Sequence, residues 1–272
     1  MKKLLTCLAA IIVAVSFLTG CVSTDAIRAL EREMKEYGFS GYRPPRANHG
    51  PGWVFRFAKT YDNNTVMVTV CDFLYPKNLV VPVKGSVSLL NRESTETLDL
   101  SLGLKVIGDL VQEISKAEAS LKSKSVTTLR VTWSKVEAEE IPDQYKFNAE
   151  GKLQPLDPAC SAAIRQIRDR GNLDTVFVVQ EALRAESIDI SVDANVDRGA
   201  QLDVELSKLL QLKPNVSWKD VSKSSVKVIE PRYVGFKAVA MIDFRPTDQL
   251  GPETVRVSGR VLTFEQAQKL AR

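Results

Sequence analysis

Three stretches of the chain carry an apolar side chain at every second position, which is the period of a β-strand. Their apolar positions are Leu98, Leu100, Leu102, Leu104 and Val106, then Ile188, Ile190, Val192, Ala194 and Val196, and finally Leu202, Val204 and Leu206. Successive side chains of a strand point to opposite faces of a sheet, so each stretch has one apolar and one polar face. We therefore expect a long strand over 98–106 and a β-hairpin over 187–206, turning at 197–200.

The remaining segments alternate between strand and helix patterns. Further strands are expected at 53–58, 66–71, 79–90, 126–133, 175–183, 226–229, 234–242 and 254–262, and helices at 24–37, 107–121 and 157–170. Asp157 and Pro158 suit the N-cap and first turn of the last helix, and Gly171 follows its end. Segments 134–156 and 217–225 are expected to be connectors. These patterns predict an α+β fold, a twisted and mostly antiparallel sheet flanked by helices, with two long amphipathic β-hairpins.

The N-terminus has the composition of an export signal. Lys2 and Lys3 precede an apolar run over 4–17, and Leu18-Thr19-Gly20-Cys21 follows directly. Such a run is too short and wrongly flanked for a transmembrane anchor, so we expect 1–20 to be a signal peptide. The residues before Cys21 resemble the lipobox of bacterial lipoproteins. That resemblance implies cleavage before Cys21 and acylation of this cysteine.

Acylation would fix the location of the protein. Each buried CH₂ of an acyl chain contributes about 0.8 kcal/mol, so several chains on Cys21 would tether the protein stably to a lipid bilayer. Val22 and Ser23 follow, with no aspartate directly after the cysteine, which resembles the sorting pattern for the outer membrane. We expect a lipid-anchored protein of the cell envelope, at the outer membrane.

Two cysteines remain for the folded part, because Cys7 leaves with the signal peptide and Cys21 carries lipid. In an oxidising compartment Cys71 and Cys160 can form a disulfide that closes a long loop. Two buried free thiols are the other interpretation.

Charge and motifs argue against several functions. The formal net charge is +4, and about +2 without Lys2 and Lys3, whereas a nucleic-acid-binding protein shows a concentrated basic face. The chain's one histidine, His49, lies in a Gly/Pro-rich loop and is expected to be an ordinary exposed residue. Motifs for metallohydrolases, serine hydrolases and phosphate-binding loops are absent from the sequence. We expect no catalytic residues, no metal, no cofactor and no nucleic-acid partner.

One family resemblance runs through the chain in order. The segments IRQIRDRG at 164–171, TVFVVQEALRAESIDISV at 175–192 and SSVKVIEPRYVGFKAVAM at 224–241 resemble the second half of the gasdermin N-terminal pore-forming domain. Upstream, VPVKGSVSLL at 81–90 and the expected first helix are similar in placement to the family's first insertion strand and first helix. The likeness spans 24–242.

The resemblance implies a gasdermin-like fold and a mechanism. Gasdermin domains stay soluble until released, then oligomerise and extend two β-hairpins into a membrane barrel. Bilayer-spanning strands need about nine to eleven residues with an apolar outer face. The candidate inserting segments are 79–90, 98–106, 187–196 and 201–206, and the candidate lipid-facing residues are Leu98, Leu100, Leu102, Leu104, Ile188, Ile190 and Val192. Partners would be the lipid bilayer and further copies of the chain.

Some features depart from the family. The first gasdermin helix is typically basic, whereas here Arg28, Arg32 and Lys35, the candidate head-group contacts, alternate with three glutamates. The sequence also shows no large C-terminal repressor domain. The tail 243–272 is expected to hold a strand and a short helix, and it is either an inhibitory segment or a structural one.

We therefore expect four regions: signal peptide 1–20, lipidated N-terminus with helix and loop 21–52, α+β domain 53–242, and tail 243–272. Two functions fit them. The first is a membrane-anchored, pore-forming envelope lipoprotein. The second is a non-lytic envelope lipoprotein that serves as a structural or protein-interaction module.

Overall fold

The computed structural model describes residues 34–61, 65–76, 80–85, 94–142, 154–193, 205–245, 254–262 and 266. The signal peptide, Cys21, Arg28 and Arg32 lie outside the described residues, and so does most of the expected return strand 201–206.

The described strands form one twelve-stranded sheet in which every pair is antiparallel. The strands are β1 Ser40–Arg46, β2 Val54–Lys59, β3 Thr65–Cys71, β4 Val83–Lys84, β5 Ser94–Asp99, β6 Thr128–Glu140, β7 Gln154–Pro155, β8 Val176–Val192, β9 Trp218–Ser222, β10 Ser225–Val228, β11 Arg232–Arg245 and β12 Thr254–Leu262. The helices are α3 Leu100–Val106, α4 Ile114–Ser123, α5 Pro158–Asp169 and α6 Leu206–Leu210, with a 3-10 turn η2 at Leu173–Thr175. The predicted fold class, α+β with a mostly antiparallel sheet flanked by helices, is confirmed.

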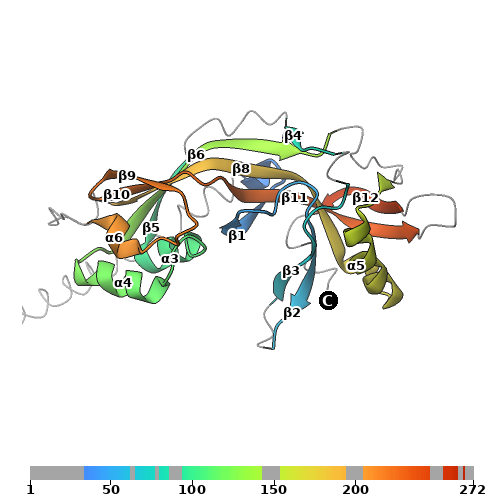
Figure 1. Ribbon diagram of the computed structural model, residues 1–272, viewed down its shortest axis with the longest axis horizontal. Helices are drawn as coiled ribbons and strands as arrows, with labels where there is room; N and C mark the ends of the chain where they lie inside the picture. Colours follow the sequence, from blue (N-terminus) through green and yellow to red (C-terminus); the bar gives the residue numbers. More distant parts are fainter. Residues whose placement is uncertain are drawn as a thin grey trace, which may run out of the picture.

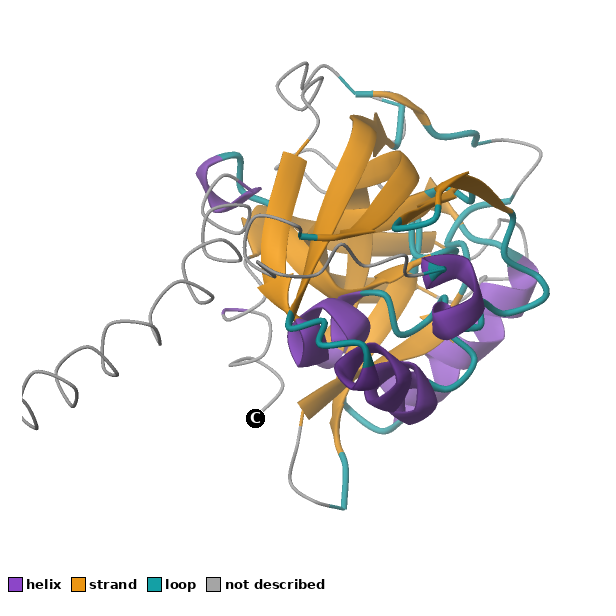
Figure 2. Cartoon of the chain, turned by 90° about the vertical axis from the view of Figure 1, so that its left-hand side faces the viewer, coloured by secondary structure: helices purple, strands orange, loops and turns teal. Residues whose placement is uncertain are grey.

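The molecule is elongated, and the 17-residue strand β8 runs through both ends (Figure 1). At one end the strand order is β9-β10-β8-β6-β5, and at the other it is β3-β2-β8-β11-β12-β7. Helices α3, α4 and α6 cover the first end, whereas α5 lies at the second, where it contacts β3 and β11 (Figure 1). Seen from the first end, the covering helices gather on one side of the strands (Figure 2).

Helix α5 begins where the sequence predicts. The Asp157 carboxylate accepts hydrogen bonds from the backbone N–H groups of Ala159 at 2.9 Å and Cys160 at 3.3 Å, which satisfies donors that the first helical turn leaves open. Gly171 follows the helix with a φ of 72°, a conformation that glycine adopts without strain. Cys160 in this helix forms a disulfide with Cys71 at the end of β3, with their Cα atoms 5.3 Å apart.

The first alternating stretch is not a strand throughout, so the prediction for 98–106 is wrong. Strand β5 ends at Asp99, and Leu100–Val106 is helix α3. The reason is that positions four apart share a face in both structures: Leu100 and Leu104 are buried by the helix as they would be by a strand. The next stretch also differs from expectation, because 107–113 is turn and bridge and α4 begins only at Ile114.

Further predictions fail at the ends of segments. Leu206, expected in the second hairpin, begins α6, and residues 134–140, expected in a connector, continue β6. The turn expected at 217–225 contains β9. Of the strand expected at 79–90, the described part forms only the two-residue β4. Within the described residues, neither expected hairpin is a strand along its full length, because Leu100–Val106 and Leu206 are helical.

The tail takes part in the sheet. Strand β12 pairs with β11 from Ala238 to Arg245, and Leu262 belongs to the aromatic core cluster. This half of the tail is structural, and residues beyond 262, apart from 266, lie outside the described part.

Candidate membrane-inserting module

One end of the sheet contains two of the four candidate inserting segments, 98–106 and the described part of 187–196. We call it the helix-covered end and define it as residues 94–134, 187–192 and 205–229. Here strand β6 lies between β5 and β8, since Leu129 pairs with Leu98 on one side and with Val192 on the other. The start of the first segment and the second segment therefore lie in one layer. They are joined by β6, which was expected as a strand at 126–133 but not as an inserting segment. Its alternation of Leu129, Val131 and Trp133 could have marked it as a further candidate.

One face of this layer is apolar and covered. Its strand residues are Leu98, Leu129, Val131, Trp133, Ile188, Ile190, Val226 and Val228, and the helix residues of the same core cluster include Leu100, Leu104, Ala117, Leu121, Leu206 and Leu210. Among the candidate lipid-facing residues, Leu98, Leu100, Leu104, Ile188 and Ile190 are at most 3% exposed. Leu102 and Val192 are half-buried. In this state, α3, α4 and α6 cover the candidate lipid-facing surface.

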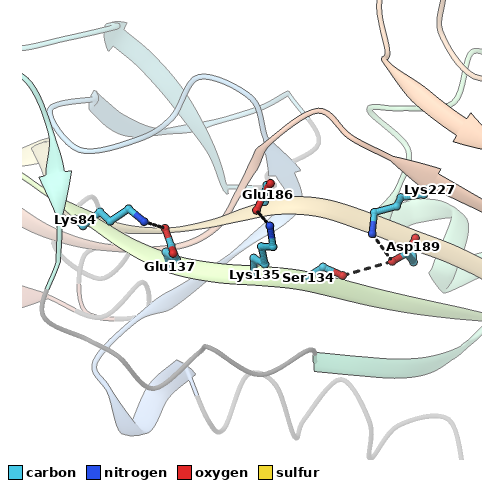
Figure 3. Close-up of polar contacts among 7 residues, drawn as sticks. All are labelled: Lys84, Ser134, Lys135, Glu137, Glu186, Asp189 and Lys227. Atoms are coloured by element: carbon cyan, nitrogen blue, oxygen red, sulfur yellow. Dashed lines mark hydrogen bonds and ion pairs between the residues drawn. The ribbon is translucent and has the colours of Figure 1, made fainter.

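The opposite face is polar and joined by hydrogen bonds. Asp193 accepts a bond of 2.8 Å from the Thr97 hydroxyl and one of 3.1 Å from the Arg130 guanidinium. Asp189 accepts bonds of 3.4 Å from both Ser134 and Lys227 (Figure 3). The helix-covered end is thus amphipathic across its thickness.

The covering helices are weakly built. At their N-caps, Asp99 of α3, Glu113 of α4 and Glu205 of α6 make no side-chain cap hydrogen bond with any described residue. The helices are only 7, 10 and 5 residues long. Isolated helices shorter than about 12–15 residues are marginal in water, so these three depend on packing against the sheet. Helix α5, at the other end of the molecule, has its cap.

Strand β5 continues into α3 without a loop. Asp99 is the last residue of the strand and Leu100 the first of the helix, with its backbone N–H donating to the Thr127 carbonyl at 2.9 Å. If α3 were extended, 94–106 would form one strand of thirteen residues. That is the length of β6, its partner in the sheet.

The other candidate residues lie elsewhere. Lys35 is exposed, within residues 34–36, the described part of the expected first helix. His49 is not an ordinary exposed residue as expected, because its ring lies edge-on to Trp53, with centroids 3.9 Å apart, and its carbonyl accepts the Tyr42 hydroxyl at 2.6 Å. Burial, and then the nearby Arg46 charge, lower the pKa of His49 to about 4.

No group of three metal-binding side chains occurs among the residues that the structure describes. Within the same residues, no helix has both the length and the apolar character to cross a bilayer.

Comparison with known proteins identifies the family. The family model "Bacterial Gasdermin Family" matches residues 43–245, about three quarters of the chain. This chain therefore belongs to the bacterial gasdermin family. The match takes in the whole helix-covered end, and it confirms the predicted gasdermin-like domain.

Solved structures of gasdermins are also similar to the chain. A bacterial gasdermin from Bradyrhizobium tropiciagri is 15% identical, with 85% of this chain and 90% of that chain covered, at a TM-score of 0.44. The Gasdermin A3 membrane pore is 13% identical, with 85% and 92% covered, at a TM-score of 0.27. The comparison with curated proteins gives no match.

Proposed function

We propose that this protein is a membrane-anchored pore-former whose helix-covered end refolds into membrane-spanning strands. One observation carries the proposal: β5 and β8 lie in one layer with β6, and the apolar face of this layer packs against α3, α4 and α6. These helices are short and have no side-chain caps among the described residues, and α3 is itself the continuation of the first alternating segment. Family membership supports it independently.

The first inserting strand would be 94–106. Extension of α3 places Leu98, Leu100, Leu102, Leu104 and Val106 on one face, and Thr97, Ser101 and Lys105 on the other. Thirteen residues exceed the nine to eleven that a tilted strand needs to cross the bilayer. The same leucines that α3 now packs against the sheet would then contact lipid.

The second inserting strand would continue β8 beyond Val192. Ile188, Ile190 and Val192 share the covered face with Leu98. The polar face of the layer, with Arg130 of β6 and with Asp189 and Asp193 of the second segment, would face the water-filled interior of an oligomeric barrel. Exchanging helix cover for lipid cover keeps apolar area out of water in both states, so the refolding does not lose the hydrophobic stabilisation.

Acylated Cys21 would supply the membrane anchor in this proposal. A tether raises the effective concentration of the domain at the bilayer, so weak head-group contacts by Arg28, Arg32 and Lys35 suffice. The protein would act at the cell envelope, at the outer membrane. Copies of the chain on the same surface would be its partners in the barrel.

Two matched substitutions on α3 test the proposal. Leu102 is half-buried and Ser101 exposed, so lysine at either position is compatible with the soluble fold. In a barrel, position 102 faces lipid, where a lysine costs about 2–4 kcal/mol at the bilayer midplane, whereas position 101 faces water. We expect Leu102→Lys to abolish dye release from lipid vesicles. We expect Ser101→Lys to reduce dye release far less.

The measurement uses the full lipidated chain, with circular dichroism and thermal unfolding to check that each variant is folded. No dye release by the unsubstituted chain, with or without residues 263–272, would leave the non-lytic envelope lipoprotein as the function. That deletion spares β12, so the sheet stays complete. Equal release by the two lysine variants would contradict the strand assignment.

A further inference from the structure

One rung of the sheet crosses all the strands of the helix-covered end that carry the alternating segments. Trp133 in β6 pairs with Ser94 in β5 on one side and with Ile188 in β8 on the other, and Ile188 pairs with Val228 in β10. The side chains of Trp133, Ile188 and Val228 are 3%, 1% and 0% exposed and belong to the same core cluster. We call this line of residues the Trp133 rung.

Strands β5, β6, β8 and β10 lead away from this rung in one direction toward the alternating segments. Strand β5 leads away with rising number from Ser94, β8 with rising number from Ile188, and β6 and β10 with falling number from Trp133 and Val228. On this side the charged residues Arg130, Asp189 and Lys227 alternate with the buried ones and so lie on the opposite face.

On the other side of the rung the pattern changes. The buried positions shift by one residue, from Trp133 to Val136 in β6 and from Ile188 to Ala185 in β8. Between them Lys135 has a φ of 52°, which is rare for a residue with a side chain, and its ammonium pairs with Glu186 at 2.8 Å (Figure 3). The pair Lys84–Glu137, also at 2.8 Å, follows on the same side (Figure 3). The strict alternation of the inserting segments therefore stops at the rung, although the core cluster itself continues past it to Val136 and Ala185.

The length of the segments beyond the rung fits a bilayer. Counting both ends, 124–133 and 188–197 each contain ten residues, and in the sequence every second position from Trp133 and from Ile188 is uncharged over these stretches. A spanning strand needs about nine to eleven residues. Both stretches are thus long enough to cross one bilayer with an uncharged outer face.

Trp133 itself has a buried hydrogen-bond donor that is unsatisfied among the described residues. Its indole Nε1 is buried and has no hydrogen-bond partner among the described residues. A buried donor without a partner costs about 1–3 kcal/mol. Tryptophan favours the membrane–water interface, where the ring is in an apolar environment and the N–H reaches water or head groups, and membrane β-barrels carry aromatic girdles at this level.

We propose that the Trp133 rung is the level at which the inserted strands leave the bilayer, and that Trp133 anchors the barrel among the lipid head groups. The inference rests on the proposed pore-forming function and adds the depth and register of insertion. Residues before the rung in β5 and after it in β6 stay outside the hydrocarbon, including the Lys135–Glu186 pair.

Depth-dependent quenching of tryptophan fluorescence tests this. The chain has three tryptophans, Trp53, Trp133 and Trp218. The variant W53F/W218F leaves Trp133 as the reporter, W133F/W218F leaves Trp53, and W53F/W133F/W218F/L100W places a reporter near the middle of the proposed span. Each full-length chain is added to vesicles of phosphatidylethanolamine and phosphatidylglycerol carrying a nitroxide either near the head group or near the end of the acyl chain, and dye release is recorded in parallel.

We expect Trp133 to be quenched more by the shallow nitroxide, the tryptophan at 100 more by the deep one, and Trp53 by neither. In vesicles that release dye, two results would overturn the rung assignment but not the proposed pore: stronger quenching of Trp133 by the deep nitroxide, or no quenching of Trp133 by either nitroxide. Vesicles that neither release dye nor quench any reporter would overturn both proposals.

A second measurement tests the same point with a single substitution. Trp133→Phe in the otherwise unchanged chain keeps the ring and removes the N–H. The difference in shallow quenching between this variant and the unsubstituted chain reports Trp133 alone. A difference of zero in vesicles that release dye argues against the proposal as directly as the single-tryptophan result.

Discussion

At the scale of single residues, His49 shows how burial couples stability to pH. Packing against Trp53 and the charge of Arg46 lower the pKa of His49 from 6.5 to about 4, so between these values the unfolded chain binds a proton that the folded chain does not. The free energy of unfolding should therefore fall as pH is lowered from about 6.5 to 4. His49→Gln should flatten this fall, measured as the difference between the two chains in denaturant titrations at several pH values. If the free energy of unfolding has the same pH dependence in both chains, His49 is not the source of the fall.

The sequence alone could not place this histidine. Its neighbours in the chain are glycine, asparagine and proline, which indicate a loop, and the aromatic cluster that half-buries it is assembled from β1, β2, β8 and β11. By contrast Asp157, Pro158 and Gly171 were predictable, because the start and end of a helix are set by local backbone chemistry.

At the scale of elements, the stability of the covering helices α3, α4 and α6 should set how fast the chain releases dye from vesicles. Glu113 has extended backbone angles at the N-cap of α4 but makes no side-chain cap hydrogen bond with the described residues. Glu113→Asp keeps the charge and shortens the side chain to one that caps well, which should stabilise α4 by about 0.5–1 kcal/mol. We expect a higher free energy of unfolding and slower dye release. Stabilisation without slower release would show that α4 does not limit the refolding.

The sequence did not predict where some elements end. The alternation of 98–106 predicted a strand, yet Leu100–Val106 is helical, because a leucine every second residue also fills one face of a short helix. Tertiary packing under β6 decides between the two structures, and that packing is not readable from the segment. The strands β2, β3, β11 and β12 were predicted to within a few residues, since their patterns fit only one structure.

At the scale of the whole molecule, the disulfide joins parts that are 89 residues apart and so encloses β4, β5, α3, α4 and β6. A cross-link over a loop of this length typically stabilises a fold by about 2–5 kcal/mol. Cys71→Ala/Cys160→Ala should lower the free energy of unfolding by that amount, and a reductant should lower the stability of the unsubstituted chain similarly while leaving the double variant unchanged. An unchanged melting temperature on reduction would argue against the cross-link.

The most direct test of the account is the pattern of lipid contact along 98–105 before and after insertion. Single cysteines introduced at successive positions and labelled with an environment-sensitive dye report that contact, since Cys71 and Cys160 are paired in the fold. In vesicles we predict a period of two, with labels at 100, 102 and 104 in lipid and those at 101, 103 and 105 in water. A helical period of three to four residues retained in vesicles that release dye would contradict the refolding of α3 into a membrane-spanning strand.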